Sequence, residues 1–166
     1  FYMSKKEQGG GALLDESHGI DLVRYVIGEA NKVFAKVMKT SSLQITSDDH
    51  AFLTLFVNKN IVGHLNFDLV SRAPRVQLEI VGTKGNLIWD RVNHELRMYN
   101  TSIKEWRTEK YKTEDFLSMY PIQAKHFYEC LIGNEKSIVD IKDALMTQKI
   151  IDCSFESSKK IGFTGR

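Results

Sequence analysis

The sequence has little of what marks a secreted, zinc-binding or membrane protein. Its two cysteines, Cys130 and Cys153, form no Cys-x-x-Cys pair, which excludes a disulfide framework and a zinc site made of cysteines alone. Free thiols are typical of a reducing compartment, so we expect a cytoplasmic protein with both cysteines on the apolar sides of helices. No apolar run approaches the roughly 18 residues of a membrane-spanning helix, so we expect no membrane partner.

An excess of one charge and the common nucleotide motifs are also absent. The 23 Lys and Arg residues nearly balance the 21 Asp and Glu residues, for a net charge of +2. The charges are mixed along the chain, so nucleic acid is not an expected partner. Gly-x-Gly-x-x-Gly, the Walker A pattern and Gly-x-Ser-x-Gly do not occur, and the histidines have no metal-ligand spacing. We therefore expect no dinucleotide or triphosphate cradle, no serine nucleophile elbow and no metal site.

What remains is an ordinary globular composition. The chain has 166 residues, of which 42% are apolar and 27% charged, as in one domain with a hydrophobic core. It begins at Phe1 rather than Met and ends at Arg166. We expect it to be a piece of a longer protein.

The hydrophobic period changes twice along the chain. Helical spacing predicts helices over 12–27, 115–132 and 140–160, and from about residue 31 to 107 a period of two predicts strands. The pair 51–57 and 61–70, joined by an Asn-Lys-Asn turn, is typical of a hairpin. This order predicts an α+β fold: a mainly antiparallel open sheet of about six strands with helices packed on one face.

Individual residues refine these elements. In the first helix the predicted apolar stripe is Leu14, His18, Leu22 and Tyr25, and Gly28 is the expected C-cap. Asp140 is the expected N-cap of the last helix. The strand 61–70 has an apolar face and an opposite polar face, which we interpret as the solvent side of a half-buried strand rather than a ligand set; the polar residues are His64, Asn66 and Asp68.

The richest segment for chemistry is Gly9 to Asp21, which reads GGGALLDESHGID. On a continuous helix His18 is three residues from both Asp15 and Asp21, so both carboxylates could flank its imidazole. Such a histidine can be held in one tautomer and exchange a proton near neutral pH. The alternative from spacing alone is structural: Asp15 as a helix cap, Asp21 solvated and His18 packed.

Four segments resemble the C-terminal domain of the Gfo/Idh/MocA oxidoreductases. They cover nearly the whole chain in the family's order: GGGALLDESHGIDLVRYVIG, FDLVSRAPRVQLEIVGTKGNLIWD, MYPIQAKHFYECLIGN and DIKDALMTQKIIDCSFESSKKIG. The resemblance implies that residues 1–166 are a substrate-binding and oligomerisation domain. It also implies an N-terminal Rossmann domain that binds NAD or NADP and carries a catalytic lysine in a Glu-Lys-Pro motif, which this chain lacks.

The resemblance also assigns roles to residues. The family's catalytic histidine matches His18, and its substrate-contacting aspartate matches Asp15. Many members have Asp-x-x-x-His where this chain has Asp-x-x-His, a spacing that resembles a subset acting on sugar acids or amino sugars. Asp21 matches a third polar position and joins the substrate-binding set, with a structural role as its alternative. Arg72 resembles a substrate-rim residue of that subset, and otherwise is a surface arginine.

The prediction is therefore the substrate-binding half of an NAD(P)-dependent oxidoreductase. Its substrate would be a sugar, polyol, sugar acid or related hydroxy compound. Its partners would be its own Rossmann domain and further copies of the same protein, which it would contact through the sheet face. The isolated chain would be inactive. Two alternatives stay open: a non-enzymatic α+β module that dimerises through its sheet or binds a ligand, and a family member in which His18 is incidental.

Overall fold

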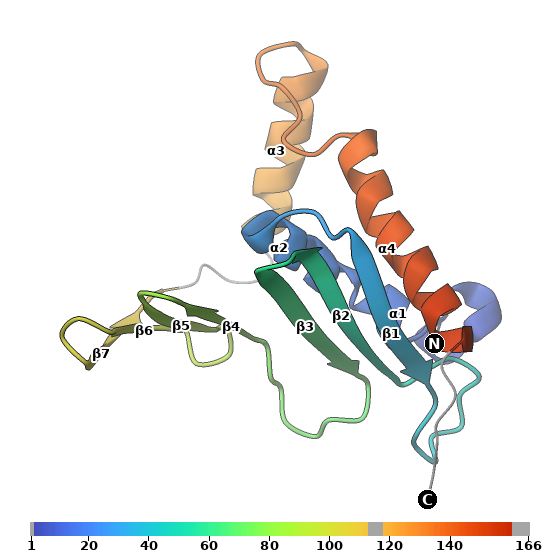
Figure 1. Cartoon of the computed structure of the whole chain (residues 1–166). Helices are drawn as coiled ribbons and strands as arrows, with labels where there is room; N and C mark the ends of the chain where they lie inside the picture. The colour runs from blue at the N-terminus through green and yellow to red at the C-terminus, as the bar shows by residue number, and fades with distance from the viewer. Residues whose placement is uncertain (1, 113–117, 161–166) are drawn as a thin grey trace, which may run out of the picture. The chain divides into compact units, whose positions relative to one another are not determined.

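The computed structural model describes residues 2–112 and 118–160 (Figure 1). The chain divides into two compact units, which are described separately. The first unit comprises Phe1–Ser71 and Val139–Arg166, and the second comprises Arg72–Ile138. Helices and antiparallel strands are both present, which confirms the predicted α+β class. The seven strands of the described residues form two sheets, of three and four strands, in place of the single sheet of about six.

The first unit holds a three-stranded antiparallel sheet and most of the helical residues. Its elements are η1 (Tyr2–Ser4), η2 (Lys6–Gln8), α1 (Ala12–Asp15), α2 (Ser17–Ile27), β1 (Lys32–Met38), β2 (His50–Asn58), β3 (Ile61–Asp68) and α4 (Ile141–Lys160). The strand order is β1-β2-β3. Ala35, Leu53 and Leu65 stand opposite one another in the register and are all buried. The predicted hairpin is confirmed.

The predicted helix over 12–27 is two helices, and its predicted apolar stripe is wrong. Glu16 has φ −97° and ψ 16°, which ends α1 and restarts the helix as α2. The break shifts the helical phase, so Ile20 and Val23 are buried while Tyr25 is 88% exposed. The predicted C-cap is confirmed, since Gly28 has φ 94° and its N–H donates to the carbonyl of Arg24.

Helix α4 lies along the outer edge of β1 (Figure 1). The Ser157 hydroxyl accepts the N–H of Ala35 at 3.0 Å, and the Ser158 hydroxyl accepts the N–H of Val37 at 2.9 Å. These serines satisfy donors that the edge strand cannot pair with another strand. At the start of α4, Asp140 caps the helix as predicted, because its Oδ1 accepts backbone N–H groups in the first turn.

The second unit is a four-stranded antiparallel meander followed by a helix. Its elements are β4 (Gln77–Gly82), β5 (Gly85–Asp90), β6 (Glu95–Asn100), β7 (Glu105–Lys110) and α3 (Met119–Leu131). Helix α3 lies within the predicted range 115–132, of which residues 115–117 lie outside the described residues. Within 2–112 and 118–160, no helix has the length and apolar character needed to cross a membrane.

Candidate functional site

The glycine-rich segment 9–11 leads directly into α1. Gly11 has φ 139°, and a Cβ at this position would lie 2.4 Å from Asp48 Oδ1, so glycine is what lets the carboxylate approach. Asp48 Oδ2 accepts the N–H of Leu13 at 3.0 Å, and its backbone carbonyl accepts the N–H of Ala12 at 3.0 Å. A carboxylate from a distant loop thus caps the first turn of α1.

Asp15 closes this turn from the other side. Its Oδ2 accepts the N–H of Gly11 at 3.0 Å, while its own N–H donates to the carbonyl of Gly11 at 2.9 Å. The side chain is half-buried against the glycine segment rather than aligned with a longer helix. Asp15 therefore fixes the loop that precedes the candidate histidine.

His18 lies in the first turn of α2, and 72% of its side chain is exposed. The nearest carboxylate is that of Glu16, whose Oε2 lies 3.3 Å from His18 Nε2. The expected flanking by Asp15 and Asp21 is not observed, because the helix breaks at Glu16 and both aspartates bond elsewhere. The imidazole is nevertheless reachable from solvent, as a proton-exchanging group must be, and one carboxylate lies beside it.

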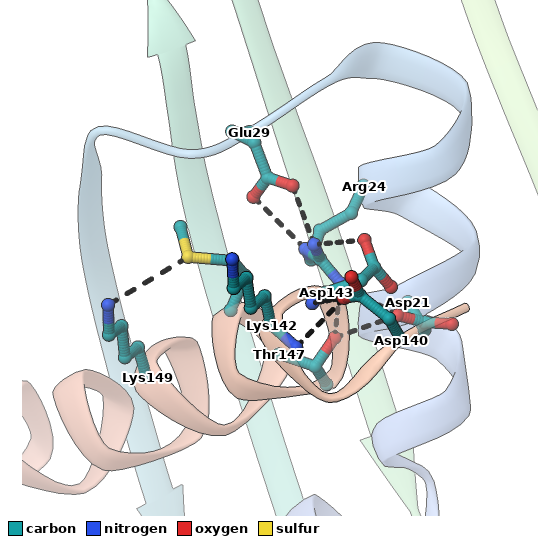
Figure 2. A network of polar contacts seen from close by, with 9 residues as sticks. Asp21, Arg24, Glu29, Asp140, Lys142, Asp143, Thr147 and Lys149 are labelled. Carbon is teal, nitrogen blue, oxygen red and sulfur yellow. Dashed lines mark hydrogen bonds and ion pairs between the residues drawn. The ribbon is translucent and has the colours of Figure 1, made fainter. Parts of the chain in front are cut away.

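Asp21 belongs to a polar network that joins α2 to α4 (Figure 2). Its Oδ1 accepts a hydrogen bond from Arg24 Nη1 at 2.8 Å and another from the Thr147 hydroxyl at 2.8 Å. Arg24 Nη1 also donates to Thr147 Oγ1 at 2.7 Å. These bonds give Asp21 a structural task in the described residues, which is the alternative that the sequence left open.

Arg24 is the centre of the network, with only 3% of its side chain exposed. It donates to both Glu29 oxygens, at 3.0 and 2.6 Å, and to Asp143 Oδ1 at 3.0 Å. The paired bond to Glu29 raises the pKa of Arg24 above its ordinary value; burial opposes this rise and Asp143 adds to it. The guanidinium therefore stays charged and ties α2, the segment after it and α4 together.

Arg72 is exposed in the segment between β3 and β4, where the second unit begins. Its role at a substrate rim stays a prediction.

Sequence reasoning missed two residues of this site, Glu16 and Arg24. A signal for Arg24 exists, because it falls on the same helical face as Ile20, Val23 and Ile27, at spacings of i+3, i+4 and i+7 from Ile20. An arginine on an apolar stripe with Asp21 three residues before it indicates a buried ion pair. Glu16 carried no such signal, because its contact depends on the helix break.

The comparison with protein families assigns the chain to one family. Residues 3–162 match the family described as the oxidoreductase family, C-terminal alpha/beta domain. The chain belongs to this Gfo/Idh/MocA family. The match covers almost the whole sequence and confirms the predicted resemblance. No curated protein matches the chain.

Solved oxidoreductases share the fold of this Gfo/Idh/MocA domain. Levoglucosan dehydrogenase in complex with NADH and levoglucosan is 20% identical, with a TM-score of 0.82 over 96% of this chain and 51% of that one. An Agrobacterium radiobacter oxidoreductase in complex with NAD+, L-tartaric acid and magnesium is 16% identical, with a TM-score of 0.76 over 96% and 49%. The WlbA dehydrogenase of Bordetella pertussis in complex with NADH and UDP-GlcNAcA is 19% identical, with a TM-score of 0.70 over 94% and 45%.

The chain spans about half the length of these solved proteins. Its own glycine segment does not fit a dinucleotide. The backbone donors that a pyrophosphate would need at the start of α1 are occupied, since Asp48 and Asp15 accept the N–H groups of residues 11–13. Two carboxylates at this turn would also repel an anionic phosphate. The nicotinamide cofactor implied by the family therefore has no cradle at this turn.

Proposed function

We propose that this chain is the substrate-binding part of an NAD(P)-dependent oxidoreductase, with the dinucleotide held by the half that the chain does not span. The substrate class is a sugar, polyol, sugar acid or related hydroxy compound. The family match supports the oxidoreductase assignment. The ligands named for the solved relatives, levoglucosan, L-tartaric acid and UDP-GlcNAcA, support a hydroxylated substrate.

His18 is the residue that we assign to proton transfer. The observation that carries the assignment is its solvent-facing imidazole at the start of α2, beside the Glu16 carboxylate at 3.3 Å. A nearby carboxylate stabilises the imidazolium that forms when the histidine accepts a proton from a substrate hydroxyl. Asp15 positions the loop before His18, and Asp21 holds α2 through Arg24. Arg72 is assigned to the substrate rim.

The test is steady-state turnover of the complete protein encoded by the reading frame that contains this chain. A panel of polyols, sugars and sugar acids is assayed by the absorbance of the reduced nicotinamide. On the best substrate, His18→Asn should lower kcat by about 10²- to 10⁴-fold, as loss of a general base does. Glu16→Gln should produce a smaller loss and alter the pH profile.

A matched histidine serves as the control. His64 is exposed on β3 and bonds to Thr54, so His64→Asn should leave kcat unchanged. Turnover retained in His18→Asn would remove His18 from the proposed role. Equal losses in both variants would show a general effect on folding rather than on proton transfer.

A second candidate function is a module that associates with another copy through the first unit's sheet. The face opposite the helices carries apolar side chains that are 38–46% exposed, namely Phe34, Phe56 and Val62. Phe56 and Val62 are paired across β2 and β3, so they form a patch rather than scattered residues. Apolar exposure of this kind on a sheet favours docking of a second sheet.

Sedimentation of the complete protein tests this candidate. Phe56→Glu should lower the oligomeric state if the sheet face is the contact, and Tyr25→Glu, at an exposed position on α2, is the control. A monomeric parent protein would contradict the candidate. An oligomer that persists in Phe56→Glu would place the contact elsewhere.

A further inference from the structure

The second unit contains a cysteine, a histidine and a glutamate in hydrogen-bonding sequence. Cys130 Sγ lies 3.6 Å from His126 Nε2, and His126 Nδ1 lies 2.5 Å from Glu135 Oε2. None of these residues belongs to the candidate site around His18. The sequence predicted that Cys130 was a core residue, whereas it is only half-buried.

Helix geometry and a tight turn bring the three side chains together. His126 and Cys130 are four residues apart on α3, so they share one face of the helix. Gly133 has φ 82°, a left-handed conformation that reverses the chain after α3. The N–H groups of Asn134 and Glu135 then donate back to the carbonyl of Glu129, at 2.9 and 3.3 Å. This return places the Glu135 carboxylate beside His126.

The order of contacts defines the tautomer of the imidazole. A carboxylate accepts only, so His126 Nδ1 carries the proton that bonds to Glu135, and Nε2 is left to accept from the Cys130 thiol. A thiol next to an oriented imidazole is a nucleophile with its base in place. The charge that His126 gains when it takes the thiol proton is stabilised by Glu135.

We propose that Cys130 is a reactive thiol that forms mixed disulfides with low-molecular-weight disulfides, with His126 as its base and Glu135 as a positioning residue. The Cys130 sulfur attacks one sulfur of R–S–S–R, and the new S–S bond forms as the old one breaks. The thiol proton passes to His126 Nε2 and then to the departing R–S⁻, which leaves as R–SH. Cys130 is oxidised and the departing sulfur is reduced.

The chain supplies its own control. Cys153 is an exposed free cysteine on α4, and its thiol makes no hydrogen bond among the described residues. Exposure alone would make Cys153 the faster thiol, so a faster Cys130 isolates the effect of His126. Trypsin separates the two, because Cys130 lies in the peptide 126–136 and Cys153 in the peptide 150–159.

The experiment treats the purified protein with glutathione disulfide at neutral pH and measures the modification rate of each peptide by mass spectrometry. Iodoacetamide serves as a second, uncharged probe. We expect Cys130 to react at least about 10-fold faster than Cys153, since the thiolate is the nucleophile. His126→Gln should lower the Cys130 rate by about 10²-fold, as loss of a general base does.

Two further variants separate reactivity from folding. Glu135 is half-exposed, so Glu135→Gln should keep the helix intact and lower the Cys130 rate by less than His126→Gln does. His64→Gln should change neither rate. A Cys130 rate at or below that of Cys153, or a rate ratio that His126→Gln leaves unchanged, would overturn the proposal. Such a result would leave His126 and Glu135 as a cap on the end of α3.

Discussion

The two units of the molecule are built on different principles. All eleven buried apolar side chains of the described residues lie in the first unit, where α2 and α4 pack on a three-stranded sheet. The second unit has four strands in register, yet β7 is exposed along its whole length. Backbone pairing is therefore sufficient to define a sheet, whereas burial decides which sheet stabilises the protein and holds a site rigidly.

The largest contrast is expected from a matched pair of core substitutions. Leu53 is 1% exposed on β2, so Leu53→Ala should lower the free energy of unfolding by about 3 kcal/mol or more. Leu87 is half-buried on β5, so Leu87→Ala should cost about 1 kcal/mol.

Spectroscopy can follow the units separately in urea. Trp89 and Trp106, the two tryptophans, both lie in the second unit, so tryptophan fluorescence reports that unit, and far-UV circular dichroism reports mainly the helices. Equal costs for the two leucine substitutions would contradict the contrast between the units.

The next largest difference in the free energy of unfolding is expected between substitutions of two arginines, one in each unit. Arg24→Leu leaves Asp21, Glu29 and Asp143 without their shared cation and should cost about 3 kcal/mol, near the low end for a broken buried pair because the carboxylates are half-exposed. Arg97 is exposed above the Trp106 ring, 4.9 Å from its centroid, so Arg97→Leu should cost about 1 kcal/mol or less. Thermal unfolding of both variants is the measurement, and the reverse ranking would refute the central role of Arg24.

One aspartate in each unit makes the stability of that unit depend on pH. Burial of Asp49 raises its pKa, but hydrogen bonds from Ser41 and Thr40 outweigh this and hold the pKa well below its usual range. In the second unit, the Asn93 N–H and then the Gln77 side chain lower the pKa of Asp90 to about 2. Both carboxylates are more acidic folded than unfolded, so their stabilisation is complete above about pH 4 and is lost as the pH falls.

The two aspartates should therefore differ in the pH at which this loss of stabilisation ends. Unfolding followed from pH 7 to 2 should show that Asp90→Asn removes a part of the acid destabilisation that has largely developed by pH 2, since the folded pKa of Asp90 is about 2. Asp49→Asn should remove a part that is still incomplete there. Carboxyl NMR titration checks the assignment directly, and an Asp90 that titrates near pH 4 would contradict it.

The smallest expected loss of stability comes from a substitution at the edge of β1. The Ser158 hydroxyl accepts from the N–H of Val37 and donates to its carbonyl, so Ser158→Ala should cost about 1 kcal/mol. Ser42→Ala, at an exposed loop position, should stay within about 0.5 kcal/mol of the parent. Urea denaturation checks both, and equal values would show that α4 does not protect this edge.

The sequence predicted most elements because their signals are local. The hairpin between β2 and β3, the cap at Gly28 and the cap at Asp140 all depend on residues within one turn. The break at Glu16 was missed, because it depends on Asp48 capping α1 from 35 residues away. Cys153 was expected in the core but is exposed, since apolar spacing does not say which helix face the sheet covers.

The candidate site was predicted in part for the same reason. His18 was proposed from its motif, but its position at the start of α2 was not predicted, because the helix break at Glu16 was missed. Its carboxylate partner, Glu16, was not found, because a continuous helix would have favoured Asp15 and Asp21. The bonds of Asp21 and Arg24 to Thr147 join segments over a hundred residues apart, and no local pattern predicts such a pairing.

We propose that this chain supplies the substrate side of an oxidoreductase and leaves the dinucleotide to the half that it does not span. Fluorescence titration of NADH and NADPH into the purified 166-residue chain, beside the complete protein, tests it most directly. We expect saturable binding to the complete protein and none to the chain, because Asp48 and Asp15 occupy the only glycine-rich helix start of the described residues. Saturable micromolar binding to the chain alone would contradict it.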